Sequence, residues 1–174
     1  MKYWGCIILN LVLYQFVYAQ TASPLTIETD EYSSYIIPSL ENGVLLLEAN
    51  QDDFKGLMKQ YRYQILQRGN ELEYLSPSSR VNQMRLIRKE NHQIQFLFSP
   101  TKLSLVKQLE ESISIRSTSI VKDSNGMTWY TCHFSEHNYD KNLLIGIRME
   151  ADKEDRVGRT WDIWSTTIVF SKKP

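Results

Sequence analysis

The chain has 174 residues, and its 20 basic and 20 acidic side chains give a formal net charge of zero. A chain of this length normally forms one domain around a single hydrophobic core. Because the charges balance, no global field attracts nucleic acid, and we expect no nucleic-acid partner.

The first 19 residues have the pattern of a secretory signal peptide. Lys2 supplies a positive charge, residues 7–17 are mostly apolar, and the small residue Ala19 stands before the predicted cleavage point at Gln20. The apolar run of about 11 residues is shorter than the about 20 that a membrane span requires. Cleavage leaves 155 of the 174 residues. We therefore expect a mature chain without a transmembrane span, in the periplasm or outside the cell.

Residues 20–42 are polar and carry two prolines, which predicts an extended lead-in before a single globular domain over residues 43–174. The short apolar run Val44–Leu47 is predicted to be a buried strand. Asn50 is then a predicted helix cap, followed by apolar residues at helical spacing. These residues are Phe54, Leu57, Met58, Tyr61 and Ile65.

Two hairpins are predicted next, over residues 63–75 with a turn at 68–70 and over residues 84–98 with a turn at 90–92. Ser99 before Pro100 predicts the start of a second amphipathic helix. Its apolar positions are Leu103, Val106, Leu109 and Ile113.

Four strands close the predicted order. Residues 113–122 and 127–134 are joined by Asn125-Gly126, which is a strong hairpin signal. Residues 143–151 and 160–171 follow, with a charged loop at 152–159 between them. The chain is thus predicted to be an α+β fold, an antiparallel sheet of eight to nine strands with two helices packed on one face.

The two halves of the chain show a partial match when they are shifted by 49 residues. Leu45 aligns with Ile94 and Leu47 with Phe96, which are apolar pairs in predicted strands, and the predicted helix caps Asn50 and Ser99 also align. A duplicated β-α-β-β unit would leave such a pattern. Coincidental patterning of strands and caps is the alternative.

His133-Phe134-Ser135-Glu136-His137 resembles the motif of the inverzincins, in which two histidines bind zinc and the glutamate is catalytic on one helix. Here the apolar pattern alternates with a period of two. It predicts a strand with Tyr130, Cys132 and Phe134 on one face and Trp129, Thr131 and His133 on the other. Because strand geometry does not bring His133 and His137 together, we predict no metal site and no cofactor.

Aromatic residues near the end of the chain are candidates for partner recognition. Trp161 is flanked by Arg159 and Asp162, and we predict it to be exposed, with Trp129 as a further binding residue. Trp164 is assigned to the core side of the same strand, together with Ile168 and Phe170.

Cys132 is the only cysteine of the predicted mature chain, because Cys6 lies in the signal peptide, and so no intrachain disulfide can form. The sequence also contains no Asn-x-Ser/Thr glycosylation site. An exported chain with neither feature is typical of bacterial envelope proteins.

These observations predict an exported, non-catalytic binding or accessory domain of the bacterial envelope that engages a protein or polysaccharide partner. Two alternatives remain open. One is an envelope hydrolase that uses His133, Glu136 and His137 with a metal ion, and the other is a structural component of an envelope complex.

Overall fold

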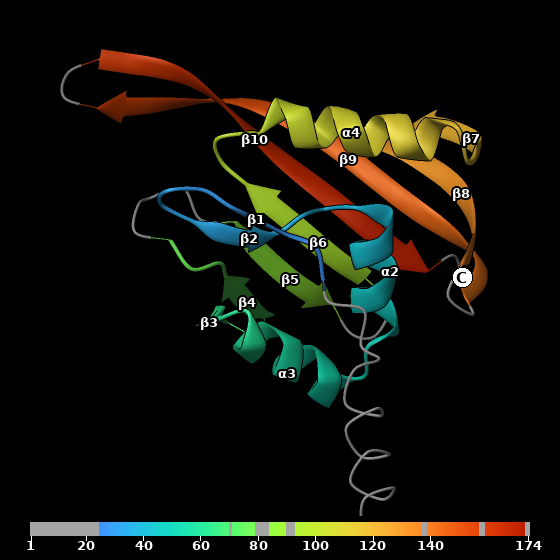
Figure 1. Cartoon of the computed structure of the whole chain (residues 1–174). Coiled ribbons are helices and arrows are strands. Elements are labelled where there is room, and N and C mark those ends of the chain that lie inside the picture. Colours follow the sequence, from blue (N-terminus) through green and yellow to red (C-terminus); the bar gives the residue numbers. More distant parts are fainter. Residues whose placement is uncertain are drawn as a thin grey trace, which may run out of the picture.

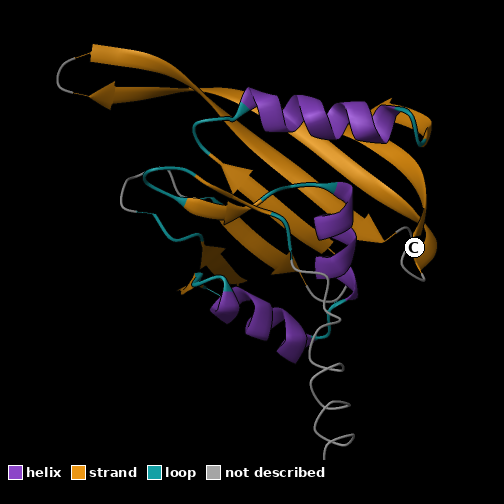
Figure 2. Ribbon diagram, viewed as in Figure 1, coloured by secondary structure: helices purple, strands orange, loops and turns teal. Residues whose placement is uncertain are grey.

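The structure is a computed structural model that describes residues 25–69, 71–78, 84–89, 93–136, 139–156 and 159–172, without the side chains of residues 136, 139–141, 152–156 and 159–162. The predicted signal peptide, residues 1–19, lies outside the described residues. The described part is an α+β fold with an eight-stranded antiparallel sheet, a two-stranded sheet and three helices (Figures 1 and 2). The predicted fold class is confirmed, with one helix more than expected.

The elements follow one another along the chain in a simple order. The N-terminal part contains β1 (Ile27–Thr29), β2 (Ser34–Ile36), α2 (Leu40–Glu48) and α3 (Gln51–Gln60). The first four strands of the large sheet are β3 (Gln64–Arg68), β4 (Glu71–Leu75), β5 (Arg85–Lys89) and β6 (Gln93–Phe98). The last part contains α4 (Leu103–Ser114), β7 (Ser117–Lys122), β8 (Thr128–Glu136), β9 (Tyr139–Arg156) and β10 (Arg159–Lys172).

The large sheet has the strand order β3-β4-β5-β6-β10-β9-β8-β7. A helix followed by four sequential strands thus occurs twice, and the two groups of strands meet where β6 pairs with β10, from Thr166 opposite Phe98 to Ser171 opposite Gln93. This arrangement does not correspond to the predicted β-α-β-β repeat. Leu45 lies in helix α2, whereas Ile94, its partner at a shift of 49 residues, lies in strand β6.

The predicted strand over residues 44–47 is wrong, because this run is part of helix α2. Ser39 begins the helix, and its side-chain oxygen accepts a hydrogen bond from the backbone N–H of Asn42 at 3.2 Å. The helix is buried on most of its surface, so its apolar residues show no clear helical period. A short continuous apolar run does not distinguish a buried strand from a buried helix.

The segment predicted as a lead-in packs against the folded body from Leu25 onward. Leu25, Tyr35 and Ile36 are buried in the main hydrophobic cluster. Asn42 binds this segment to α2: its Oδ1 accepts from Thr26 N at 3.0 Å, and its Nδ2 donates to Thr26 O and Ile37 O, both at 2.8 Å. The predicted boundary between residues 42 and 43 therefore falls inside helix α2.

The predicted cap of α3 is confirmed, since Asn50 Oδ1 accepts from the backbone N–H groups of Asp52 and Asp53. The helix ends at Gln60, and Ile65, which was assigned to it, is an exposed residue of β3. Helix α4 begins at Leu103 rather than at Pro100. The segment before it is bound to β10 instead, because Thr101 N donates to Trp164 O and the hydroxyls of Thr101 and Thr166 are hydrogen-bonded.

All three helices contact the same face of the large sheet. The ring of Phe54 in α3 meets Tyr74 of β4 edge-on at 5.2 Å between centroids. Gly43 of α2 lies against Phe170 of β10, and the Cys132 thiol of β8 donates to Ile113 O of α4. The strand register places Tyr74, Phe170 and Cys132 on one face, and the core lies between this face and the helices.

Strands β9 and β10 continue beyond the sheet as a two-stranded arm, which we define as residues 148–156 and 159–165 (Figure 1). The paired residues of β8 oppose only Tyr139–Ile147 of β9, and those of β6 oppose only Thr166–Ser171 of β10. The predicted charged loop over 152–159 is wrong, since its described residues belong to this arm. The strands of a hairpin pair through backbone hydrogen bonds, which form with charged as well as with apolar side chains. A charged segment can therefore be part of a strand.

Candidate functional site

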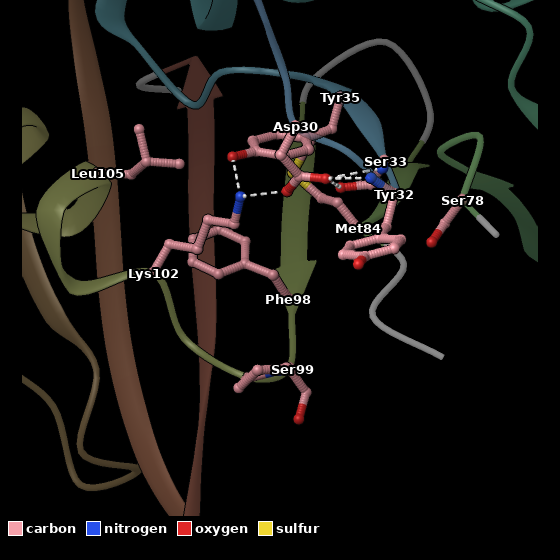
Figure 3. A pocket seen from close by; sticks show the side chains of 11 residues that line it. Asp30, Tyr32, Ser33, Tyr35, Ser78, Met84, Phe98, Ser99, Lys102 and Leu105 are labelled. Atoms are coloured by element: carbon pink, nitrogen blue, oxygen red, sulfur yellow. Dashed lines mark hydrogen bonds and ion pairs between the residues drawn. The ribbon is translucent and has the colours of Figure 1, made fainter. Parts of the chain in front are cut away.

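A pocket of about 130 Å³ lies where the β1–β2 hairpin meets the end of β6 and the start of α4 (Figure 3). Its wall is mainly apolar and is formed by Tyr35, Met84, Phe98, Pro100 and Leu105. Four of these side chains are almost fully buried, namely those of Tyr35, Met84, Phe98 and Leu105. Buried side chains of the hydrophobic core therefore form the apolar floor of the pocket.

The polar wall of the pocket is built around Lys102, which directly precedes α4. Its Nζ lies 3.2 Å from Asp30 Oδ2 and donates to the hydroxyl of Tyr35 (Figure 3). The same Nζ lies 3.4 Å from Oε1 of Glu28, a residue that does not itself line the pocket. These acceptors come from β1, β2 and the turn between them. The ammonium group of Lys102 thus connects the N-terminal hairpin to the start of α4.

Asp30 shapes the turn between β1 and β2. Its Oδ1 accepts hydrogen bonds from Tyr32 N and Ser33 N, both at 2.8 Å, and from Ser33 Oγ at 2.9 Å. Hydrogen bonds from Tyr32 N, from the Ser33 hydroxyl and from Lys102 together hold the pKa of Asp30 far below its ordinary range. Asp30 is consequently a carboxylate at neutral pH.

Lys102 and Tyr35 keep their protons. Burial raises the pKa of Tyr35 to about 12. Burial opposes the charged form of Lys102, but hydrogen bonds to Tyr35 and Asp30 outweigh it and raise the pKa of the ammonium group. A general base needs a pKa near the working pH. Asp30, Tyr35 and Lys102 are shifted away from that range, so this set is suited to binding rather than to proton transfer.

An exposed apolar surface adjoins the pocket at the root of the arm. It consists of Leu103, Met149 and Trp164, whose exposed fractions are 56%, 42% and 50%, and we call it the arm-root patch. Met149 pairs with Thr166 and Trp164 with Ala151, so the two side chains are close on one face of the arm. Thr101, between the pocket residues Pro100 and Lys102, donates its N–H to Trp164 O. This hydrogen bond places the segment that carries Pro100 and Lys102 beside the arm at Trp164.

Trp164 was predicted to lie in the core, and this prediction is wrong. Its position alternates with the buried Ile168 and Phe170 as expected, yet half of its surface is exposed. Trp164 lies on the arm, beyond the part of β10 that pairs with β6. The alternation of apolar residues along β10 predicts the face on which Trp164 lies. It does not show where along the strand the covering helices end.

The predicted binding residues do not form one aromatic platform. Trp129 lies on the face opposite the helices, where its ring packs over Gly146 and its Nε1 donates to Asp123 Oδ2 at 2.9 Å. Gly146 pairs with Val169, and Trp161 is eight positions away along β10, on the order of 26 Å at about 3.3 Å per residue. Arg159, Trp161 and Asp162 lie in the arm, and their side chains are outside the described part of the chain.

His133 of the histidine motif lies on a strand, as predicted. His133 is exposed on β8, and Cys132, its neighbour on the opposite face, is fully buried. His137 and the side chain of Glu136 are outside the described residues. Within the described part of the chain, no three side chains of His, Cys, Asp or Glu are grouped closely enough to hold a metal ion.

None of the described helices is both long enough and apolar enough to cross a bilayer. Comparisons with protein-family models, with curated protein sequences and with solved structures find no match to this chain. The pocket and the arm-root patch are therefore the features from which a function can be inferred.

Proposed function

We propose that this chain is an exported, non-catalytic binding domain of the bacterial envelope that engages a protein partner through the arm-root patch and the adjoining pocket. The observation that carries this proposal is the grouping of Leu103, Met149 and Trp164, all at least 42% exposed, beside an apolar pocket. Exposed apolar side chains gathered next to a concavity are typical of binding sites.

A polypeptide suits this region better than a polysaccharide. Tryptophan and methionine are enriched in protein interfaces, and tryptophan is among the commonest hot-spot residues. Two of the three side chains in the patch, Leu103 and Met149, are flexible and aliphatic, and a sugar-stacking surface would instead need flat aromatic rings. The pKa shifts of Asp30, Tyr35 and Lys102 support a binding role at the pocket.

The proposal can be tested with a displayed library of random peptides, selected on the protein from residue 20 onward. Peptides that bind should lose affinity about 30-fold or more for Trp164→Ala, which corresponds to a loss of about 2 kcal/mol at a hot spot. Ile65→Ala is the matched control, because Ile65 is 61% exposed and lies on β3 at the far edge of the sheet. It should change affinity by less than about twofold. Selected peptides that bind the Trp164→Ala protein as well as the parent protein would refute the proposed site.

A further inference from the structure

Lys102 is the cation among the described residues that line the pocket, and all of its donors are engaged. A lysine ammonium has three N–H donors. Those of Lys102 are taken by Asp30 Oδ2 at 3.2 Å, by Glu28 Oε1 at 3.4 Å and by the Tyr35 hydroxyl. An anionic ligand would have to displace one of these groups. A ligand that carries a positive charge does not depend on these donors.

The charges near this wall also favour a cationic ligand. Glu28, which contacts Lys102 but does not itself line the pocket, and Asp30 carry two formal negative charges against the one positive charge of Lys102, so these three described side chains sum to −1. Asp30 lines the pocket and its side chain is 41% exposed, so a ligand in the pocket can approach this carboxylate. The side chain of Glu28 is 40% exposed and lies 3.4 Å from Lys102 Nζ, so its charge adds to the negative field near the pocket. A cation is attracted there and an anion is repelled.

The apolar floor sets the size of the group that can enter. A cavity of about 150 Å³ lined by apolar side chains holds one benzene molecule. This pocket measures about 130 Å³, with Phe98, Met84 and Leu105 in its wall. Its volume is therefore comparable with that of a site for one aromatic ring or one branched aliphatic side chain.

We infer that the pocket binds a single aromatic or branched apolar side chain that adjoins a positive charge. The apolar group enters the floor between Phe98, Met84 and Leu105, and the cation lies on the side of Asp30, where the charge of Glu28 adds to the attraction. This inference rests on the proposed function and specifies the partner. The segment that docks at the arm-root patch carries a basic group next to its apolar anchor.

Three small probes of equal size test this recognition: phenethylamine, phenylacetate and 2-phenylethanol. Binding is followed by the shift of the Met84 methyl resonance during titration of protein labelled at methionine methyl groups. Phenethylamine should bind at least about tenfold more tightly than phenylacetate, with the neutral alcohol between them, because their rings are the same and only the charge differs. Glu28→Gln should reduce this preference severalfold while the alcohol binds as before. Equal binding of the amine and the acid would overturn the inference.

Two substitutions locate the bound probe. Ser99 is an exposed residue of the pocket rim, so Ser99→Trp should block the pocket and weaken phenethylamine binding about tenfold or more. Ser104→Trp is the matched control, since Ser104 is also exposed but lies on α4 and does not line the pocket. It should leave binding unchanged. If Ser99→Trp binds phenethylamine as well as the parent protein does, the probe is bound elsewhere and the inference is wrong.

The peptide selection separates failure of this inference from failure of the proposed function. If phenethylamine shows no preference but selected peptides depend on Trp164, the function stands and the specificity assigned to the pocket does not. If the probes behave as expected and no Trp164-dependent peptide is found, the pocket is a small-molecule site and the proposed protein partner is wrong.

Discussion

The backbone of Gly43 in α2 lies directly against the ring of Phe170 in β10. A Cβ atom at residue 43 would be 2.4 Å from Cδ1 of that ring. Phe170 has no exposed surface and packs edge-on against Phe96 at 5.7 Å between centroids, so the ring has nowhere to move. We expect Gly43→Ala to lower the free energy of unfolding by about 1–3 kcal/mol through overpacking, although alanine is the better helix former.

Gly56 provides the control for this substitution. It lies in α3 at an exposed position, and a Cβ atom there would have no neighbour within 4 Å. Gly56→Ala should therefore raise the free energy of unfolding by about 0.5–1 kcal/mol. Urea unfolding of both variants measures the two effects. If both substitutions change the free energy of unfolding in the same direction, α2 does not approach β10 as closely as described.

Cys132 should be chemically inert in the folded protein. The residue has no exposed surface, and burial raises the pKa of its thiol, so little thiolate is present to react. In a Cys6→Ser background, which leaves one thiol, labelling by an aromatic disulfide should be many times slower for the native than for the urea-unfolded protein. Similar rates in the two states would contradict the burial of this strand face. Cys132→Ala should cost on the order of 1 kcal/mol of stability.

The hydrogen bond between Trp129 and Asp123 should make the stability depend on pH. The indole N–H of Trp129 and the backbone N–H groups of Met127 and Asn125 hold the pKa of Asp123 below its ordinary value of 3.8. A carboxylate with a lowered pKa stabilises the fold above its unfolded pKa, and the contribution is lost as the pH falls through the folded pKa.

Asp123→Asn should therefore lower the midpoint of thermal unfolding at pH 7, and the difference from the parent protein should shrink below about pH 3.8. Comparison of unfolding midpoints at pH 7 and pH 3 measures this change. Lys122→Gln is a suitable control, because it alters the charge of the neighbouring residue without removing an acceptor from Trp129. A difference that is the same at both pH values would rule out a role of the carboxylate charge.

Export and processing can be tested directly by mass spectrometry. Expression of the whole chain in a bacterial host should yield protein that begins at or near Gln20 and is recovered from the periplasm or the medium. Replacing Ala19 with a bulky residue such as tryptophan should block this cleavage. A purified parent protein that retains Met1 to Ala19 would contradict the predicted signal peptide.

Local signals in the sequence predicted those elements that depend on a few neighbouring residues. The Asn50 cap of α3 and the Asn125-Gly126 turn are of this kind, and Gly126 has the positive φ of 78° that such a turn requires. The alternation around Cys132 predicted the correct faces of β8. In each case the physical cause acts within a few positions of the chain.

Features that depend on distant residues were not predicted. The wall of the pocket combines Asp30, Lys102 and Phe98, which come from separate elements and become neighbours only in the fold. Helix α2 was predicted as a strand, because a helix buried on most sides has no polar face to reveal its period. The exposure of Trp164 depends on where the covering elements end, which its own strand does not encode.

The position of β10 has a consequence for how the protein is made. This strand follows all the others along the chain, yet it lies in the middle of the sheet, between β6 and β9. Until it is synthesised, β6 has a bare inner edge, Phe96 lacks its partner Phe170, and Gly43 of α2 lacks the ring against which it lies. The core therefore closes only after β10 has been synthesised. Neither half of the sheet can cover its inner edge before this strand is in place, so the two halves complete their folding together.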